Sequence, residues 1–199
     1  MSMDKQPSPP KPFERVMLFI DGGYLRELCK KYYGHDSINF DGLRQLLIGN
    51  FNLSEHNSFQ ANLIKTYYYD AIVAESHKDY PTQKAYFSAI DLLPFYTVRL
   101  GRLVESSKKG FKQKGVDVLM VIDALTKAYQ NQYEAGMFFV GDRDFVPLIE
   151  AVKNAGKKTV GIYHKPTCSV DLLPCFDWRI RFRKTEIEFW MKKRKAENT

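Results

Sequence analysis

The sequence predicts an α/β fold with a central, mainly parallel sheet that helices cover on both faces. Short apolar runs of strand length alternate with longer segments of helical periodicity, which is the order of elements in a parallel sheet. The runs are also continuously apolar, as expected for strands that are buried on both faces. Val16–Ile20 (VMLFI) and Gly136–Val140 (GMFFV) are the clearest examples.

The first half of the chain is expected to hold three strands and three helices. After the first strand, Gly22-Gly23 opens a helical stretch to about Tyr33. Asp41 is the expected N-cap of a helix through Ile48, which Gly49-Asn50 would end. The later elements of this half are a strand at Ile64–Tyr69, a helix at Thr82–Leu92 and a strand at Tyr96–Val104.

The second half begins with Glu105–Lys114, which is polar, basic and interrupted by glycine, so a mobile loop is expected there. Val116–Tyr129 has the dense apolar spacing of a helix that packs on a sheet. The elements expected after Gly136–Val140 are a helix at Phe145–Ala155, ended by Gly156, a strand at Thr159–Tyr163 and a strand at Trp178–Phe182.

Size and composition indicate one domain. A chain of 199 residues with 44% hydrophobic residues can bury one good core, since domains usually hold about 100–200 residues. The domain is assigned to residues 14–183. Residues 1–13 contain four prolines and predict a disordered tail, and residues 184–199 predict a basic C-terminal helix and tail.

Several classes of protein are excluded by residue type and spacing. Three cysteines form no CxxC pair, and four histidines lack the spacing of zinc ligands. No apolar run approaches the roughly 20 residues of a membrane span, and the N-terminus lacks the apolar region of a signal peptide. No GxGxxG follows the first strand, which argues against a nucleotide-binding dehydrogenase. We therefore expect a cytoplasmic protein without a membrane partner.

The net charge of +7 is unevenly distributed. Arg99–Lys114 carries a net charge of +5 and Trp178–Lys195 carries +6, which leaves −4 for the rest of the chain. A polyanionic partner that docks beside an acidic site would explain this separation. Basic runs that only solvate a surface and a tail are the alternative, and the charge pattern alone does not decide between the two.

Three aspartates are expected at one edge of the sheet. Asp21 directly follows the first strand, and Asp142 follows Gly136–Val140 through Gly141. Ligands bind beyond the carboxyl ends of strands in open parallel sheets, so these two acids should lie close together. Asp117 joins them if its helix begins at the same edge. Converging carboxylates repel one another unless a cation lies between them, and Mg²⁺, which prefers oxygen ligands, can activate water for phosphodiester hydrolysis.

Structural roles are the alternative for several of the aspartates. Asp21 is also placed to cap the helix that follows it, and Asp144 could cap the helix FVPLIEAV. Asp123 could pair with Lys127 at i+4. Asp70, after the strand residues TYYY, is interpreted as a turn residue. For Asp144 and Asp123, the structural and the metal-binding interpretations both remain open.

The strings FIDGGYL (residues 19–25), KGVDVLMVIDAL (114–125) and GDRDFVPLIEAVKNAGKKTVGI (141–162) occur in this order. Together they resemble the three signature blocks of the NYN domain, a branch of the PIN-like nucleases, over most of Val16 to about Ile180. The resemblance implies a Rossmann-like (PIN-like) α/β sandwich and a ribonuclease that uses Mg²⁺ or Mn²⁺. It implies catalytic, metal-binding acids at Asp21, Asp117 and Asp142, with Asp144 and Asp123 as further metal ligands. Many relatives have Asn where this chain has Tyr24, in the pattern FIDGxN.

The expected partner is single-stranded RNA, and the expected enzyme is an endoribonuclease. Phe111 and Tyr24 could stack on unpaired bases, whereas Trp190 is assigned to the apolar side of the C-terminal helix. The expected RNA-binding side chains are Lys108, Lys109, Lys112, Lys114, Arg99, Arg102 and Arg143. A PIN-like module that binds RNA or protein without cutting is the first alternative, and another Mg²⁺-dependent phosphoesterase is the second. A homodimer is also left open.

Overall fold

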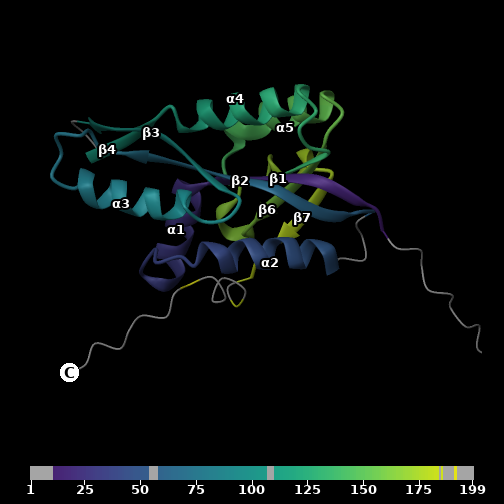
Figure 1. Cartoon of the computed structure of the whole chain (residues 1–199), viewed down its shortest axis with the longest axis horizontal. Coiled ribbons are helices and arrows are strands. Elements are labelled where there is room, and N and C mark those ends of the chain that lie inside the picture. Colours follow the sequence, from purple (N-terminus) through teal and green to yellow (C-terminus); the bar gives the residue numbers. More distant parts are fainter. Residues whose placement is uncertain (1–10, 54–57, 107–109, 184, 186–190, 192–199) are drawn as a thin grey trace, which may run out of the picture.

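The computed structural model describes residues 11–53, 58–106, 110–183, 185 and 191. It contains a seven-stranded sheet with the order β4-β3-β2-β1-β5-β6-β7 (Figure 1). All neighbouring strands are parallel except β3 and β4, which are antiparallel. The mainly parallel α/β class is therefore confirmed. The strands are β1 Phe13–Asp21, β2 Gln60–Ile72, β3 Tyr96–Ser106, β4 Gly110–Lys114, β5 Ala135–Phe139, β6 Lys158–Tyr163 and β7 Trp178–Arg181.

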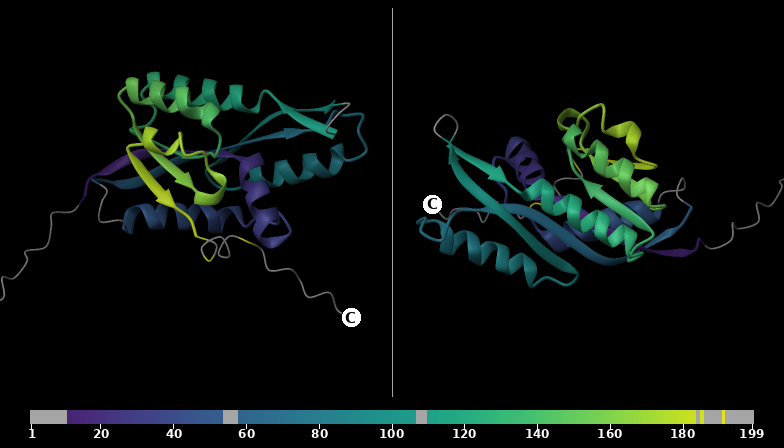
Figure 2. Two further views of the ribbon diagram at one scale, coloured as in Figure 1. Left: turned by 180° about the vertical axis from the view of Figure 1, so that it is seen from behind. Right: turned by 90° about the horizontal axis from the view of Figure 1, so that it is seen from above.

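Helices cover both faces of the sheet, so the molecule has three layers (Figures 1 and 2). One face carries α1 (Gly22–Tyr33), α2 (Phe40–Leu53) and α3 (Tyr80–Asp91), and the other carries α4 (Val116–Tyr129) and α5 (Val146–Asn154). Successive side chains of β1 enter opposite layers: the first hydrophobic cluster contains Val16, Leu18 and Ile20, and the second contains Met17 and Phe19. This double burial explains why the strand is continuously apolar.

The predicted start of α2 is wrong by two residues and its predicted end by five. Asn39 caps this helix, because its side-chain oxygen accepts the N–H of Gly42 at 3.1 Å, and Asp41 lies within the first turn. Gly49-Asn50 does not end the helix, which continues to Leu53. Burial of Phe51 against the core holds the last turn in place, since tertiary packing overrides the weak helix propensity of a single glycine.

The prediction of a mobile loop at Glu105–Lys114 is wrong for all of its described residues, which belong to two strands. β3 extends to Ser106, and β4 returns beside it as the second strand of a hairpin, with Arg102 opposite Lys114. Residues 107–109, at the tip, lie outside the described residues. Charged side chains are common on such edge strands, because they discourage pairing with another sheet. A basic run therefore did not distinguish an edge strand from a loop.

Both predicted termini lie mostly outside the described part of the chain. Phe13, at the end of the predicted tail, already belongs to β1. In the C-terminal segment only Thr185 and Met191 are described, and Met191 forms an isolated bridge with Ile38. Apart from these two residues, the predicted basic C-terminal helix and tail, with Trp190, fall on residues that are not described. Among the described helices, none is both long enough and apolar enough to cross a membrane.

Candidate active site

Three aspartates lie in one cleft at the carboxyl edge of the sheet. Asp21 is the last residue of β1, and Asp142 follows the neighbouring parallel strand β5. The β3–β4 hairpin returns the chain to this edge, where α4 begins and places Asp117 in its first turn. This acidic cleft has a volume of about 780 Å³. Its other lining residues are Gly23, Tyr24, Glu27, Leu103, Phe111, Lys112, Gln113, Gly141, Arg143, Thr167 and Ser169.

Asp21 both caps a helix and lines the acidic cleft. Its Oδ1 accepts the backbone N–H of Tyr24 at 3.0 Å, which satisfies a free amide of α1. Burial, together with the negative charges of Asp117 and Asp70, raises the pKa of Asp21 to about 6, although the capping bond acts in the opposite direction. The two interpretations of Asp21 are therefore compatible, because one oxygen caps the helix while the carboxyl group remains at the cleft.

Glycines allow the close packing on which the cleft is built. A Cβ on Gly22 would lie 2.5 Å from the ring of Tyr68 and 2.7 Å from the carbonyl oxygen of Tyr69, so only glycine fits where α1 begins. A Cβ on Gly141 would lie 2.4 Å from the ring of Tyr24. The hydroxyl of Tyr24 shares a 3.0 Å hydrogen bond with Thr167. Tyr24, at the position where the sequences that this chain resembles often have asparagine, is therefore a packed wall of the cleft.

Asp117 and Asp142 are both exposed to solvent. Partial burial raises the pKa of Asp117, and the charges of Asp142 and Asp144 raise it further. Asp142 caps the short helix η1 (Arg143–Phe145), because its Oδ1 accepts the N–H of Asp144 at 3.1 Å. The capping role considered for Asp144 thus belongs to Asp142. Asp144 does not line the cleft but contributes its charge to Asp117.

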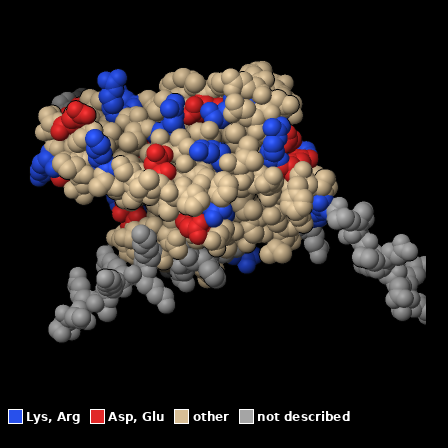
Figure 3. Space-filling model, viewed as in Figure 1, with Lys and Arg blue, Asp and Glu red and all other residues tan. Residues whose placement is uncertain are grey.

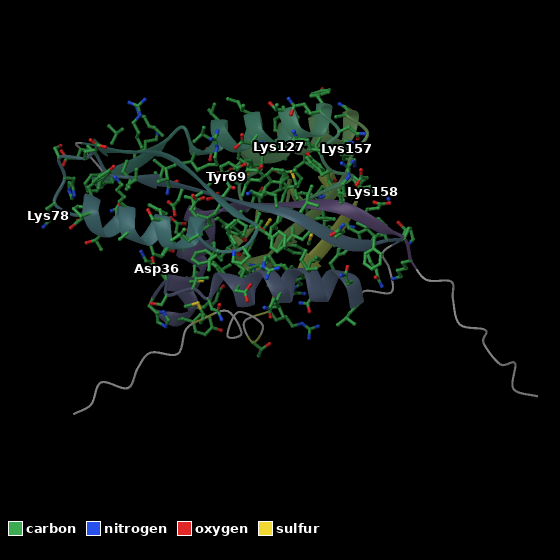
Figure 4. The ribbon with its side chains drawn as sticks, in the orientation of Figure 1. Asp36, Tyr69, Lys78, Lys127, Lys157 and Lys158 are labelled. Atoms are coloured by element: carbon green, nitrogen blue, oxygen red, sulfur yellow. The ribbon has the colours of Figure 1, made fainter. Side chains whose placement is uncertain are left out.

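Asp123 is not brought to the acidic cleft. Its Oδ2 accepts from the Tyr69 hydroxyl at 3.2 Å and from Arg99 Nε at 2.9 Å. Lys127 Nζ lies 3.5 Å from Oδ1 of Asp123, so these residues form the i+4 ion pair that was one of the two interpretations of Asp123. Tyr69 and Lys127 are labelled in Figure 4. This carboxylate is therefore part of a structural ion-pair network between β2, β3 and α4.

The basic residues expected to bind RNA are dispersed. Lys112 and Arg143 line the acidic cleft. Arg102 and Lys114 line a neighbouring cavity, and Arg99 is bound to Asp123. Lys108 and Lys109 lie outside the described residues. Charges of both signs alternate on the face of the molecule in Figure 3, where no large region of one sign is visible.

Four polar residues of the cleft were missed by the sequence analysis. Glu27 lies one turn after Tyr24 on α1, so helical spacing could have revealed it. Thr167 and Ser169 follow β6, whose carboxyl end meets the same edge once the strand order is known. Gln113 lies on β4 and had no signal, because its segment was interpreted as a loop.

The donor set of the cleft fits a hard divalent cation bound through few protein ligands. No group of three or more His, Cys, Asp or Glu side chains in the described part of the chain is arranged to hold an ion. Mg²⁺ usually keeps several waters and binds through one or two carboxylates and substrate phosphates. Asp21, Asp117 and Asp142 have no basic partner within 4.0 Å among the described residues. A cation would relieve the repulsion among these carboxylates, which adds to the effect of burial in raising the pKa values of Asp21 and Asp117.

Comparisons with known proteins agree with this architecture. A crystal structure of a protein of unknown function from Vibrio parahaemolyticus has a similar fold, with a TM-score of 0.64 and 15% identity over 94% of this chain and all of that chain. No curated protein sequence matches. The family model of the NYN domain, a PIN-like group whose members are generally nucleases, matches residues 15–175. Because this segment covers most of the sequence and contains the whole acidic cleft, the chain belongs to the NYN domain family.

Proposed function

We propose that this protein is a Mg²⁺- or Mn²⁺-dependent ribonuclease that hydrolyses RNA phosphodiester bonds in the acidic cleft. One observation carries the proposal: Asp21, Asp117 and Asp142 converge from three separate elements without a basic partner among the described residues. Such an arrangement is costly for folding unless a cation is bound there. The family, whose members are generally nucleases, supports the same reaction.

One or two of the carboxylates of Asp21, Asp117 and Asp142 would hold the ion, and water and a substrate phosphate would complete its ligands. A bound Mg²⁺ or Mn²⁺ supplies an activated water and stabilises negative charge on the phosphate. Lys112 and Arg143 line the same cleft and can neutralise phosphates of the bound strand. Gln113 places an amide in the cleft. Its Nε2 donates to Asp70 Oδ1 at 3.5 Å, and this bond holds the amide from behind the cleft.

Single-stranded RNA suits the cleft better than a duplex. Phe111 is 46% exposed at the cleft, where its ring can stack on an unpaired base. A module that only binds RNA is the first alternative function, but three converging carboxylates would weaken the binding of a polyanion in the absence of a metal ion. Another Mg²⁺-dependent phosphoesterase is the second alternative, and it differs in accepting small phosphate esters.

The test compares Asp142→Asn with a matched control, Asp123→Asn. Both changes remove one carboxylate charge, but only Asp142 lines the acidic cleft, and Asn at position 142 can still cap η1. Each protein is incubated with end-labelled single-stranded RNA in Mg²⁺, in Mn²⁺ and in EDTA. We expect cleavage by the wild type and by Asp123→Asn in metal only, and a loss of roughly 100-fold or more in Asp142→Asn.

Cleavage by Asp142→Asn at the wild-type rate, or cleavage that persists in EDTA, would contradict the proposal. If the wild type binds RNA in a salt-sensitive way but never cuts it, the binding module becomes the better function. A parallel assay with a small aryl phosphate distinguishes a general phosphoesterase.

A further inference from the structure

A second cavity lies next to the acidic cleft. It has a volume of about 690 Å³ and is lined by the loop that follows β2, the first residue of α3 and the β3–β4 hairpin. We call it the base pocket and define it by Glu75, His77, Tyr80, Arg102 and Phe111. Two residues, Phe111 and Leu103, line both the acidic cleft and the base pocket. A ligand that occupies the cleft therefore reaches the base pocket by passing one aromatic ring.

The walls of the base pocket offer stacking surfaces. The rings of His77 and Phe111 lie 5.4 Å apart between centroids, with 83° between their planes, and so form a corner. Tyr80 is a third aromatic wall, and its hydroxyl donates to Glu75 Oε1 at 3.1 Å. This bond holds the carboxylate at the pocket, where it can accept from the N–H groups of a base edge.

Charge separates the two cavities. Among the described residues, the lining of the base pocket includes Glu75 and Glu105 and one cation, Arg102. This balance disfavours a phosphate, whereas the apolar and aromatic walls favour a flat heterocycle. The acidic cleft has Lys112 and Arg143 beside its carboxylates. The two cavities are thus suited to the two parts of one nucleotide strand, the backbone in the cleft and a base in the pocket.

We propose that the base pocket holds one unpaired nucleobase of the RNA strand whose phosphate lies in the acidic cleft. This inference rests on the proposed function and extends it, because it gives the cleft a position-specific contact with the substrate. Stacking on Phe111 supplies most of the affinity for that base, and Glu75 discriminates among base edges.

The experiment measures binding of fluorescent oligoribonucleotides in Ca²⁺, a hard cation that also takes oxygen ligands, and cleavage of the same oligonucleotides in Mg²⁺. In a series of probes, a single abasic nucleotide replaces each position in turn. The proteins are wild type, Phe111→Ala, Phe111→Tyr, His77→Ala and a control, Tyr129→Ala. Tyr129 is also an exposed aromatic residue, but it lies at the end of α4 and lines neither cavity.

We expect Phe111→Ala to bind intact RNA about 10-fold more weakly, His77→Ala to bind it several-fold more weakly, and Phe111→Tyr and Tyr129→Ala to bind as the wild type does. One abasic position should weaken wild-type binding to a similar degree and leave Phe111→Ala unaffected. Equal abasic sensitivity in the wild type and Phe111→Ala, while the wild type still cleaves RNA, overturns the base pocket alone. Failure of the wild type to bind or cleave any RNA overturns the proposed function as well.

Discussion

Buried or partly buried carboxylates in this protein fall into two groups that differ in their partners. Asp70 is fully buried and accepts two bonds from Arg26, at 2.8 and 2.7 Å, and one from the Tyr68 hydroxyl at 3.0 Å. Asp21, on the neighbouring strand and opposite Tyr69, has only backbone partners among the described residues, and its pKa is raised. Asp70 therefore has a structural role, because the side chain of Arg26 neutralises its charge within the fold. Asp21, an aspartate at the same edge of the sheet, has no such basic partner among the described residues and so remains available to a ligand.

The largest effect on stability is expected from Asp70→Asn, because Arg26 would lose its charged partner. Asp70→Asn leaves the guanidinium of Arg26, whose side chain is 25% exposed, without a counter-charge inside the fold. We expect a loss of about 3 kcal/mol in the free energy of unfolding, toward the lower end for a broken buried pair, measured by urea denaturation. The control is Asp142→Asn, which should change stability by about 0.5 kcal/mol or less because Asp142 is exposed. Equal stability of the two variants would remove the distinction between the groups.

The positions of the unpaired acids could be predicted from sequence, and so could the local pair of Asp123 with Lys127, but the long-range partners of the paired acids could not. Asp21 and Asp142 follow continuous apolar strands and Asp117 begins an amphipathic helix, so local patterns were sufficient. Asp70 was interpreted as a turn residue, which is wrong: it lies inside β2, and its partner Arg26 is 44 positions away. Such pairs depend on how the elements pack in the tertiary structure, and the spacing of residues in the sequence does not predict them.

The hairpin shows a second limit of sequence patterns. A polar, basic stretch predicts a loop when only composition is considered, although an edge strand tolerates the same residues because one side of it faces solvent. The α/β class depended on strands in the interior of the sheet and was therefore predicted correctly. Gln113, which lies on the misinterpreted strand, enters the site only through the tertiary structure, whereas Phe111 on the same strand was expected to contact RNA.

The next effect concerns Asp21, whose ionisation in the absence of a cationic partner lowers the free energy of unfolding. A pKa raised from 3.8 to about 6 means that the folded protein binds this proton more tightly than the unfolded chain does. Stability therefore falls as pH rises from about 4 to about 6, by about 3 kcal/mol in total, and the cost is absent below pH 4. Asp21→Asn, which can keep the cap of α1, should be more stable than the wild type above pH 6 by up to this amount.

The measurement is the free energy of unfolding of both proteins from pH 4 to pH 8 in EDTA, repeated with Mg²⁺. Added Mg²⁺ should stabilise the wild type and leave Asp21→Asn unchanged, since a ligand that binds only the folded state stabilises it by mass action. A difference between the two proteins that is constant across this pH range would mean that ionisation of Asp21 carries no such cost.

The smallest effect on stability is expected at Asp123. This acid has basic partners and lies on α4 together with Asp117, which has none among the described residues, so the two groups of acids can be compared within one helix. Its side chain is 11% exposed, but its partner Arg99 is 42% exposed, so solvent screens part of the attraction. Asp123→Asn should cost about 1 kcal/mol in urea denaturation and leave both the cleavage rate and the stabilisation by Mg²⁺ unchanged. Loss of cleavage at nearly unchanged stability would instead assign Asp123 to the metal site. The division between paired and unpaired acids would then fail within α4, because a carboxylate held by Arg99 and Lys127 would have to leave both cations to reach the ion.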